Sequence, residues 1–452
     1  MSTQSENLTR VQQKSASDLS ALMQDVLARA RAQGASDATV SVNHDEGYSV
    51  DVRMREVETV SFNEDKGVSL VVYIGHRKGG ASSTDTSPKA LDALVTAACD
   101  IARVSAEDPC FGLADKELMT DKFPDLDLYH PWAINPPEAI EMALSCEAHA
   151  LDHDKRITNS DGVSVSTYNF IHGFANTYGG RGIISGSRHS ISCSLIAKEG
   201  EAMQRDYDYT TSRHFKDLTS LDQLAKSAVS RATSRLGARQ IKTQKTPVLF
   251  SSRVSSSILS SFINAISGSN LYRKNSFLLD SLGKQIFPES FRIYEQPHLK
   301  KGLGSSPFDG EGVLTRNNIF VEDGKLCQYA LGSYSARRMG LKTTANSGGV
   351  HNLTLDANAG GFDDLLKKMD KGLLVTELMG QGVNGITGDY SRGATGFWVE
   401  NGEIQYPVEE ITIAGNLKEM FLAIKAVGND INPNIATQCG SILIDGMTIA
   451  GH

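Results

Sequence analysis

Three short motifs carry side chains whose spacing could support chemistry. His149 and His153 lie one helical turn apart with Cys146 on the same side, and a histidine pair at i, i+4 can bind zinc. Ser281-Leu-Gly-Lys284 matches S-x-x-K, in which a lysine supports a serine nucleophile. Gly380-Gln-Gly-Val-Asn-Gly385 matches G-x-G-x-x-G, which binds a pyrophosphate where a helix follows a strand. A metal site, a serine hydrolase and a nucleotide site are therefore the candidates.

The surrounding sequence favours a structural interpretation of each motif. The histidine pair sits in an acidic helix without a clear fourth ligand, which indicates a solvated helix face. No second serine motif and no G-x-S-x-G elbow accompanies S-x-x-K. The residues after Gly385 are typical of turns and strand, so a tight glycine turn against another backbone is the better interpretation there.

His351 is a further candidate, and two interpretations of it stay open. It stands in the glycine-flanked segment Ser347-Gly-Gly-Val-His-Asn352. The glycines could let a substrate chain approach the imidazole. Equally, the segment could be a polar turn in which the histidine caps a neighbour. The sequence offers no third residue that would complete a mechanism.

A zinc-hydrolase motif is absent from the sequence. H-E-x-x-H does not occur, and none of the 11 histidines is followed by glutamate. A catalytic zinc needs three fixed ligands and one open position for water. We therefore expect no metal and no catalytic residue in this chain alone.

Composition and charge bound the class of protein. The chain has 452 residues, of which 40% are hydrophobic and 22% charged, with a formal net charge of -8. These values are typical of a globular protein of two or three domains, and the negative charge argues against a nucleic-acid partner. Six dispersed cysteines without a C-x-x-C pair, a polar N-terminus and no long apolar stretch predict a cytoplasmic protein with no membrane contact.

The first half of the chain predicts two units with the same plan. A helix over 15–33 is followed by an antiparallel meander, and Ser87-Pro88 begins a second helix with serine at the cap. A second unit then repeats helix, strands and helix, which indicates two packed α+β layers. The expected strands of the first unit are 38–42, 48–53, 56–62 and 67–74, separated by polar turns at 43–47 and 63–66; the second unit has helices at 137–153 and 219–236 around strands near 165–176, 181–197 and 200–210.

The second half is richer in short strands and glycine turns. A buried strand at 247–250 precedes a helix over 253–267, and Asn401-Gly402 is the strongest hairpin signal in the chain. Helices at 362–369 and 416–427 are expected to pack on a mostly antiparallel sheet or a partly closed barrel.

The predicted fold class is therefore α+β. Its units are an N-terminal α+β unit at 1–110, a central α+β unit at 111–240 and a C-terminal β-rich domain at 241–452.

Several segments in order along the chain resemble the PmbA/TldE family. They are Arg77-Lys-Gly-Gly-Ala-Ser-Ser-Thr-Asp85, Asp108-Pro-Cys110, Tyr272-Arg-Lys274, Ser333-Tyr-Ser-Ala-Arg-Arg338, Thr376-Glu-Leu-Met-Gly-Gln-Gly382, Thr387-Gly-Asp-Tyr-Ser-Arg-Gly393, Gly396-Phe-Trp-Val-Glu-Asn-Gly402 and Gly446-Met-Thr-Ile-Ala-Gly451. The resemblance implies a subunit of a TldD–TldE metalloprotease that hydrolyses unfolded or small peptides.

The same resemblance marks a departure from the metal-binding branch. TldD-like members carry an H-E-x-x-x-H helix a few residues before an Arg-Lys pair, which is Arg273-Lys274 here. The corresponding window is Ser260-Ser-Phe-Ile-Asn-Ala265, where hydroxyl and apolar side chains replace the ligands. The resemblance implies a TldD-like partner that supplies one zinc-like metal.

A TldE-like chain in the resembling assembly contributes to an enclosed cleft that holds an extended peptide. The implied cleft or interface residues are Met379, Gln381, Gly382, Ser391, Arg392, Gly393 and His351. The alternative for each of these residues is a purely structural role, in forming a turn or closing the barrel. The alternative for the chain is a regulatory binding protein of the gyrase-modulator type. A homodimer of the isolated chain is also possible.

Overall fold

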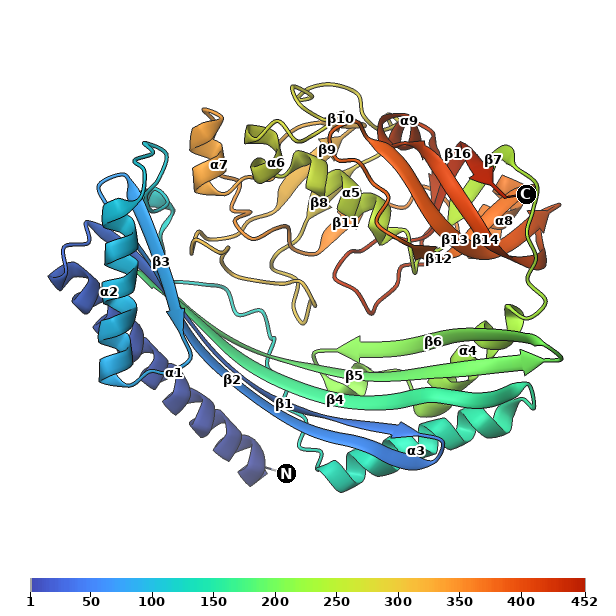
Figure 1. The fold of residues 1–452 in the computed structure, drawn as a ribbon, viewed down its shortest axis with the longest axis horizontal. Coiled ribbons are helices and arrows are strands. Elements are labelled where there is room, and N and C mark those ends of the chain that lie inside the picture. Colours follow the sequence, from blue (N-terminus) through green and yellow to red (C-terminus); the bar gives the residue numbers. More distant parts are fainter. Residues whose placement is uncertain (1, 452) are drawn as a thin grey trace.

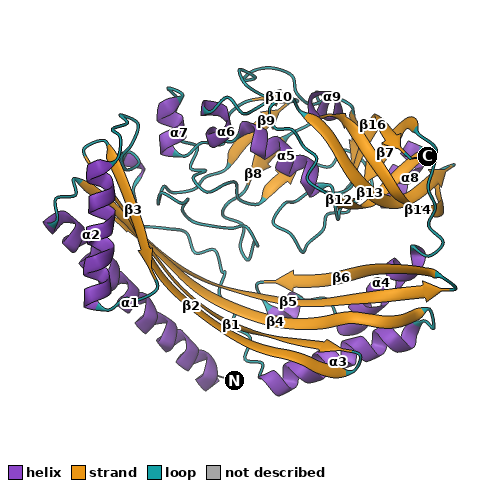
Figure 2. Ribbon diagram, in the orientation of Figure 1, coloured by secondary structure: helices purple, strands orange, loops and turns teal. Residues whose placement is uncertain are grey.

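A long curved sheet and a compact β-rich region make up the molecule. The computed structural model describes the backbone of residues 2–451 and the side chains of residues 16–451. Figures 1 and 2 show the curved sheet with helices on its outer side and the C-terminal half of the chain above its inner side. The α+β fold class predicted from the sequence is confirmed.

The curved sheet has six antiparallel strands in the order β3-β2-β1-β4-β5-β6. The prediction of two packed layers is wrong, because β1 and β4 pair directly and join the strands of both units into this one sheet. The elements are α1 (Ser2–Ala32), β1 (Asp37–Arg53), β2 (Glu56–Ile74), β3 (Arg77–Ser83), α2 (Pro88–Val104), η1 (Lys116–Leu118), α3 (Pro136–His153), β4 (Ile157–Asn176), β5 (Arg181–Glu199), β6 (Ala202–Ser212), η2 (Phe215–Asp217) and α4 (Leu221–Ser234).

Two helix pairs cover one face of this sheet. Alternate residues of β1 point the same way, so Val40 and Val50 lie on the same face. Val40 belongs to the core with α1 and α2, whereas Val50 belongs to the core with α3 and α4. Ser87 caps α2 as predicted, by accepting a hydrogen bond from the Ala90 amide.

The predicted turns at 43–47 and 63–66 are wrong, because both segments continue long strands. Asn43 pairs with Gly67 on β2 and with His172 on β4, so its backbone is held from both sides. The segment lies between the stretches covered by the two helix pairs, and polar side chains can stay there because they pair across strands. The His172 imidazole, for example, lies 3.0 Å from an Asp45 carboxylate oxygen.

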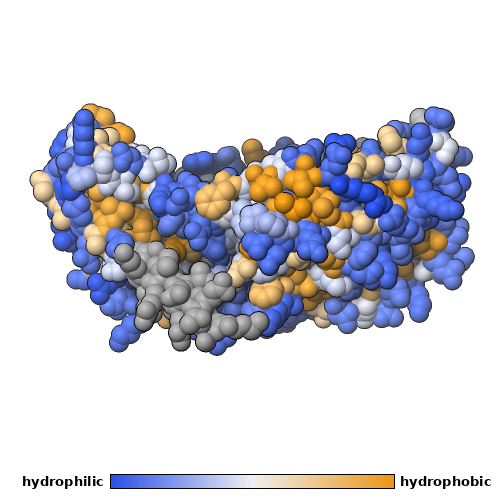
Figure 3. Space-filling model, turned by 90° about the horizontal axis from the view of Figure 1, so that it is seen from below, coloured by the Kyte–Doolittle hydropathy of each residue, from blue (hydrophilic) through white to orange (hydrophobic). Residues whose placement is uncertain are grey.

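Apolar side chains also reach the outer surface of the sheet. Val60 and Phe62 of β2 pair with Val50 and Tyr48 of β1 and therefore share their face. Phe62 is nevertheless 69% exposed. In the view from below, apolar side chains form a patch that is surrounded by polar surface (Figure 3).

The C-terminal half contains a closed ring of strands. Neighbours in the order β14-β13-β12-β7-β16 are paired, and a further pairing of β14 with β16 closes five strands, as the predicted barrel requires. The elements are β7 (Gln244–Phe250), α5 (Ser256–Ile266), α6 (Gly268–Tyr272), β8 (Ile293–Glu295), β9 (Asn318–Glu322), β10 (Lys325–Leu326), α7 (Ser333–Arg338), β11 (Leu353–Leu355), α8 (Phe362–Met369), β12 (Gly372–Met379), β13 (Asp389–Glu400), β14 (Glu403–Asn416), α9 (Leu417–Leu422), β15 (Ile424–Val427) and β16 (Ile442–Ala450).

Two local predictions in this half have different outcomes. Asn401 and Gly402 form the predicted hairpin turn, with φ of 55° and 72°, and Glu400 pairs with Glu403. The helix predicted over 416–427 is confirmed as α9 up to Leu422, but its extension to 427 is wrong, since β15 follows. The β15 segment is drawn into a strand because it pairs with β16 and buries its apolar side chains in the barrel.

No helix among residues 2–451 is both long enough and apolar enough to cross a bilayer.

A buried carboxylate supports the turn between β1 and β2. Met54 and Arg55 occupy this turn with φ of 51° and 66°, a backbone region that side chains other than glycine, asparagine and aspartate rarely adopt. Glu147 of α3 is fully buried and accepts the Met54 amide at 2.9 Å and the Arg55 amide at 2.6 Å. The helix thus holds the turn in its strained conformation.

We expect Glu147→Gln to lower the free energy of unfolding by about 2 kcal/mol. The glutamine oxygen can still accept one of the two backbone amides, but its NH2 group would face the other amide, and neither of these two N–H donors would have an acceptor. Urea unfolding followed by circular dichroism measures the change. Glu141→Gln on the exposed side of the same helix is the matched control and should be neutral. Equal stability of the two variants would contradict this account of the turn.

His189 is buried in its neutral form on β5, next to the edge strand β6. Its Nε2 lies 2.8 Å from the His130 carbonyl oxygen, an acceptor only, so Nε2 carries the proton. Its Nδ1, 2.9 Å from Thr167 Oγ1, must then accept the hydroxyl proton. Burial, with a smaller effect of His214, lowers the pKa of His189 below 6.5.

Acidification should therefore destabilise the fold through His189. As the pH falls through about 6.5, the unfolded chain binds a proton that native His189 resists. The contribution of His189 to the free energy of unfolding is therefore fully present only above about pH 7.5 and is lost progressively as the pH decreases from 7 to 5.5. His189→Gln keeps a donor for the His130 carbonyl and removes the titration. Thermal unfolding across this pH range should show a smaller loss in the variant, and an identical loss would refute the assignment.

Candidate functional site

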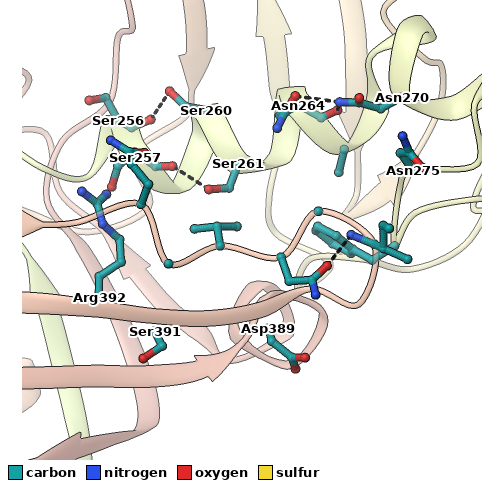
Figure 4. A pocket seen from close by; sticks show the side chains of 18 residues that line it. Ser256, Ser257, Ser260, Ser261, Asn264, Asn270, Asn275, Asp389, Ser391 and Arg392 are labelled. Carbon is teal, nitrogen blue, oxygen red and sulfur yellow. Dashed lines mark hydrogen bonds between the residues drawn. The ribbon is translucent and has the colours of Figure 1, made fainter.

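A cavity of about 1270 Å³ with both polar and apolar lining lies between α5 and the barrel. One wall is the exposed side of α5, and the other is the loop after β12 together with the start of β13 (Figure 4). Its polar lining residues are Ser256, Ser257, Ser260, Ser261, Asn264, Asn270, Asn275, Gln381, Asn384, Asp389, Ser391 and Arg392.

Helical periodicity places the serines of α5 toward the cavity. The buried residues of this helix, among them Ile258 and Phe262, face the barrel core, so the intervening serines face the opposite side. Ser260 Oγ donates to the Ser256 carbonyl at 2.9 Å, and Ser261 Oγ donates to the Ser257 carbonyl at 3.0 Å. Because these hydroxyl protons are used within the helix, both oxygens offer lone pairs to the cavity.

The window that replaces the metal-binding motif lies on this wall. Ser260, Ser261 and Ala265 all line the cavity. A neutral hydroxyl and a methyl group do not fit a zinc-like ion, which prefers imidazole, thiolate or carboxylate. Among the side chains of residues 16–451, no group of three or more His, Cys, Asp or Glu is placed to hold a metal. The donor set of this chain therefore does not suit a catalytic metal at α5.

The glycine-rich loop forms the opposite wall without a helix. Gly380 has a φ of 75°, and the Ser391 amide donates to the Gly382 carbonyl at 2.7 Å. A Cβ atom at Gly382 would collide with the Ser391 carbonyl oxygen. No helix begins at this loop, so its amides are not arranged for a pyrophosphate. The predicted glycine turn against a neighbouring backbone is confirmed.

The predicted cleft residues separate into two groups. Gln381, Gly382, Ser391 and Arg392 line the cavity. Met379 and Gly393 pair with each other where β12 and β13 meet, directly beside it. Their assignment to a peptide cleft stays a prediction.

His351 does not line this cavity and lies before β11. Its backbone amide donates to Glu295 Oε2 at 2.7 Å, and its ring Nδ1 is 3.6 Å from the same oxygen. Glu295 is buried and also accepts from the Asn318 and Asn346 amides. These contacts fit the interpretation of this segment as a polar turn in which His351 packs on its neighbours.

The other two motifs do not assemble into sites. Cys146 is buried, whereas His149 and His153 are exposed on α3. Ser281 is buried and its hydroxyl donates to the Leu279 carbonyl, while Lys284 is exposed. The structural interpretation favoured by the sequence fits both arrangements.

Four charged residues that the sequence does not single out fix the cavity to the curved sheet. Asp206 of β6 accepts from Arg253, which precedes α5, with two contacts of 3.1 Å. Arg235, which follows α4, lies 3.4 Å from Asp206 and 2.7 Å from Glu377 of β12. The Asp206 side chain is only 7% exposed, so these contacts are weakly screened. No spacing signal could reveal the cluster, because its members are far apart in sequence.

A smaller cavity of about 290 Å³ adjoins this cluster. It is lined by Asp206, Arg253 and Glu377 and shares Ser256, Ser257 and Arg392 with the larger cavity. Arg392 therefore stands where the two cavities meet.

Three family models match the chain. They are the PmbA/TldA metallopeptidase domain 1 at residues 38–102, the central domain at 129–236 and the C-terminal domain at 243–451. Together they span most of the sequence.

Individual relatives match over nearly the whole length. The chain is 51% identical to Metalloprotease PmbA of Escherichia coli O157:H7 over 422 residues, 93% of this chain and 94% of that protein. A crystal structure of a putative modulator of DNA gyrase from Bacteroides thetaiotaomicron has a TM-score of 0.90 and 30% identity, covering 96% of this chain and 99% of that one. TldE from Thermococcus kodakarensis has the same fold, with a TM-score of 0.84 at 20% identity, covering 95% and 100%.

The Asp206 cluster predicts a large effect for one substitution. Asp206→Asn leaves two guanidinium groups at the domain junction without their shared carboxylate, so we expect a loss of about 3 kcal/mol in the free energy of unfolding. Urea unfolding measures the loss, and limited proteolysis between β6 and β7 should become faster. The control is Asp222→Asn, which breaks an exposed ion pair with Lys226 and should cost little. A neutral Asp206→Asn would show that the junction does not depend on this cluster.

Proposed function

The chain belongs to the PmbA/TldA metallopeptidase family, and from this premise we propose that it is the metal-free subunit of a heteromeric peptidase. In this proposal a TldD-like partner supplies one zinc-like metal, and the complex hydrolyses unfolded or small peptides in the cytoplasm. The metal, when bound to the partner, would lower the pKa of its water so that hydroxide attacks the peptide bond.

One observation carries the proposal: the side of α5 that corresponds to the metal-binding window faces the cavity with neutral groups. Ser260 and Ser261 keep hydroxyl groups there, and Ala265 offers a methyl group. The resemblance to the metal-binding branch places imidazole and carboxylate groups at these positions. This chain retains the helix and the cavity but not the ligands, which supports a division of labour between two related subunits.

The lining of the cavity supports a part in holding the peptide. Serine hydroxyls and the amides of Asn264, Asn270 and Asn275 offer donors and acceptors without charge. Such groups match the N–H and C=O groups of an extended backbone and do not select a particular side chain. A volume of about 1270 Å³ accommodates a short stretch of peptide.

Metal analysis and a cleavage assay test this division of labour. We expect no stoichiometric metal in the purified chain and about one metal per heterodimer after co-purification with a TldD-like chain. Cleavage of an unstructured peptide should require both chains and should stop when a chelator is added.

The control pairs this chain with a TldD-like partner whose first motif histidine is replaced by alanine, which should abolish cleavage without preventing assembly. Peptide cleavage by this chain alone that survives a chelator would overturn the proposal. Stoichiometric zinc bound to the lone chain would do so equally.

A further inference from the structure

We infer that Arg392 binds the C-terminal carboxylate of a peptide at one end of the cavity. The identification of the ligand as a peptide rests on the proposed function. The binding of a carboxylate group rests on the surroundings of Arg392 itself.

Arg392 is a partly buried cation whose guanidinium lies near the neutral Tyr390 hydroxyl and has no anionic partner among residues 16–451. Its Nε is shielded from solvent and makes no hydrogen bond, and within residues 16–451 no carboxylate forms an ion pair with its guanidinium. Its neighbour in the strand pairing is the apolar Ile413. A guanidinium removed from water without a compensating anion is unfavourable, so a ligand anion would relieve this cost.

The nearby carboxylates are already committed to other arginines. Asp206 contacts Arg253 and Arg235, and Glu377 contacts Arg235. Glu377 also accepts the Thr395 hydroxyl at 3.3 Å. Asp206 and Glu377 thus face three arginines, counting Arg392, so this cluster by itself carries one positive charge in excess.

The side chain of Arg392 is directed at the wall where a ligand would bind. Figure 4 shows it extending from β13 toward Ser256 and Ser257 in the first turn of α5. The positive end of the helix dipole adds to the potential of the guanidinium at this point. Asn270 and Asn275 line the opposite end of the same cavity (Figure 4).

A carboxylate fits this site better than a phosphate does. One guanidinium binds the two oxygens of a carboxylate through two parallel hydrogen bonds and neutralises its single charge. A phosphate carries more charge than one arginine balances. The rest of the cavity offers mainly neutral amide and hydroxyl groups, which suit the backbone that leads to a terminal carboxylate. Its one lining carboxylate, Asp389, accepts hydrogen bonds from the Thr387 hydroxyl and the Asn416 side-chain amide. The site would therefore position a peptide by its C-terminal end.

Binding of two matched peptides to the isolated full-length chain tests the inference. Both peptides have the same uncharged sequence and an N-terminal fluorophore, and they differ only in a free C-terminal acid or an amide. Fluorescence anisotropy should show about tenfold tighter binding of the acid, as expected for a charge-assisted, bidentate hydrogen bond. Arg392→Gln should reduce this ratio to about one and leave the affinity for the amide unchanged.

Arg292→Gln is the matched control, because this arginine lies in the same half of the chain, pairs with Glu322 and does not line the cavity. It should keep the tenfold ratio, and Arg392→Lys should retain an intermediate one. Equal binding of acid and amide by the wild type would overturn the inference and leave the proposed function standing. Acid preference that persists in Arg392→Gln would also overturn it. Failure of both peptides to bind would count against the inference and against peptide binding in the proposed function.

Discussion

The buried ion cluster at Asp206 is the constraint on which the geometry of the site depends. It joins β6 of the curved sheet to the segment before α5 and, through Arg235, to β12 of the barrel. These elements build the two walls of the cavity, so their relative position follows from contacts made at one point. A buried charge cluster tolerates the loss of a member poorly, because the remaining charges are left without compensation. We therefore expect this cluster to fix the sheet and the barrel more firmly than a polar linker alone would.

The cavity wall on α5 shows how one scaffold can present different chemistry. The apolar face of the helix is fixed by the barrel core, which demands residues such as Ile258 and Phe262. Most of the opposite face packs less tightly, and Ser260 and Asn264 there are exposed, so such residues can change with little effect on the fold. Here they are hydroxyl and amide groups, which bind through hydrogen bonds, together with the Ala265 methyl group, and this set does not suit a zinc-like metal. Fold and activity are thus separable on this helix.

Strand edges near the site are closed or covered. The barrel has no free edge among its five ring strands, since β14 pairs with β16. The outer edge of β6 is covered by side chains, because Arg253 donates to the Tyr207 carbonyl and Asn434 contacts both Tyr209 and Thr211. Such covering satisfies backbone groups that would otherwise recruit another strand. A peptide in this cavity would accordingly be held through side chains, which gives the serines, the asparagines and Arg392 their importance.

The sequence by itself determined the features that depend on near neighbours. The Asn401-Gly402 hairpin, the Ser87 cap and the glycine turn at 380–385 follow from the conformations that these residues prefer. Segments with clear periodicity also revealed the α+β class, and ordered motifs revealed the family.

Only the tertiary structure decided features that depend on distant partners. Polar residues at 43–47 satisfy their backbone groups equally well in a turn or between two strands, and pairing with β2 and β4 selected the strand. In the same way, pairing with β16 selected the strand β15 at the end of the predicted helix at 416–427. The cavity gathered Gln381, Ser391 and Arg392 but left His351 apart, and the Asp206 cluster carried no local signal. Long-range contacts of this kind are set by how sheets and helices pack, which no short stretch of sequence encodes.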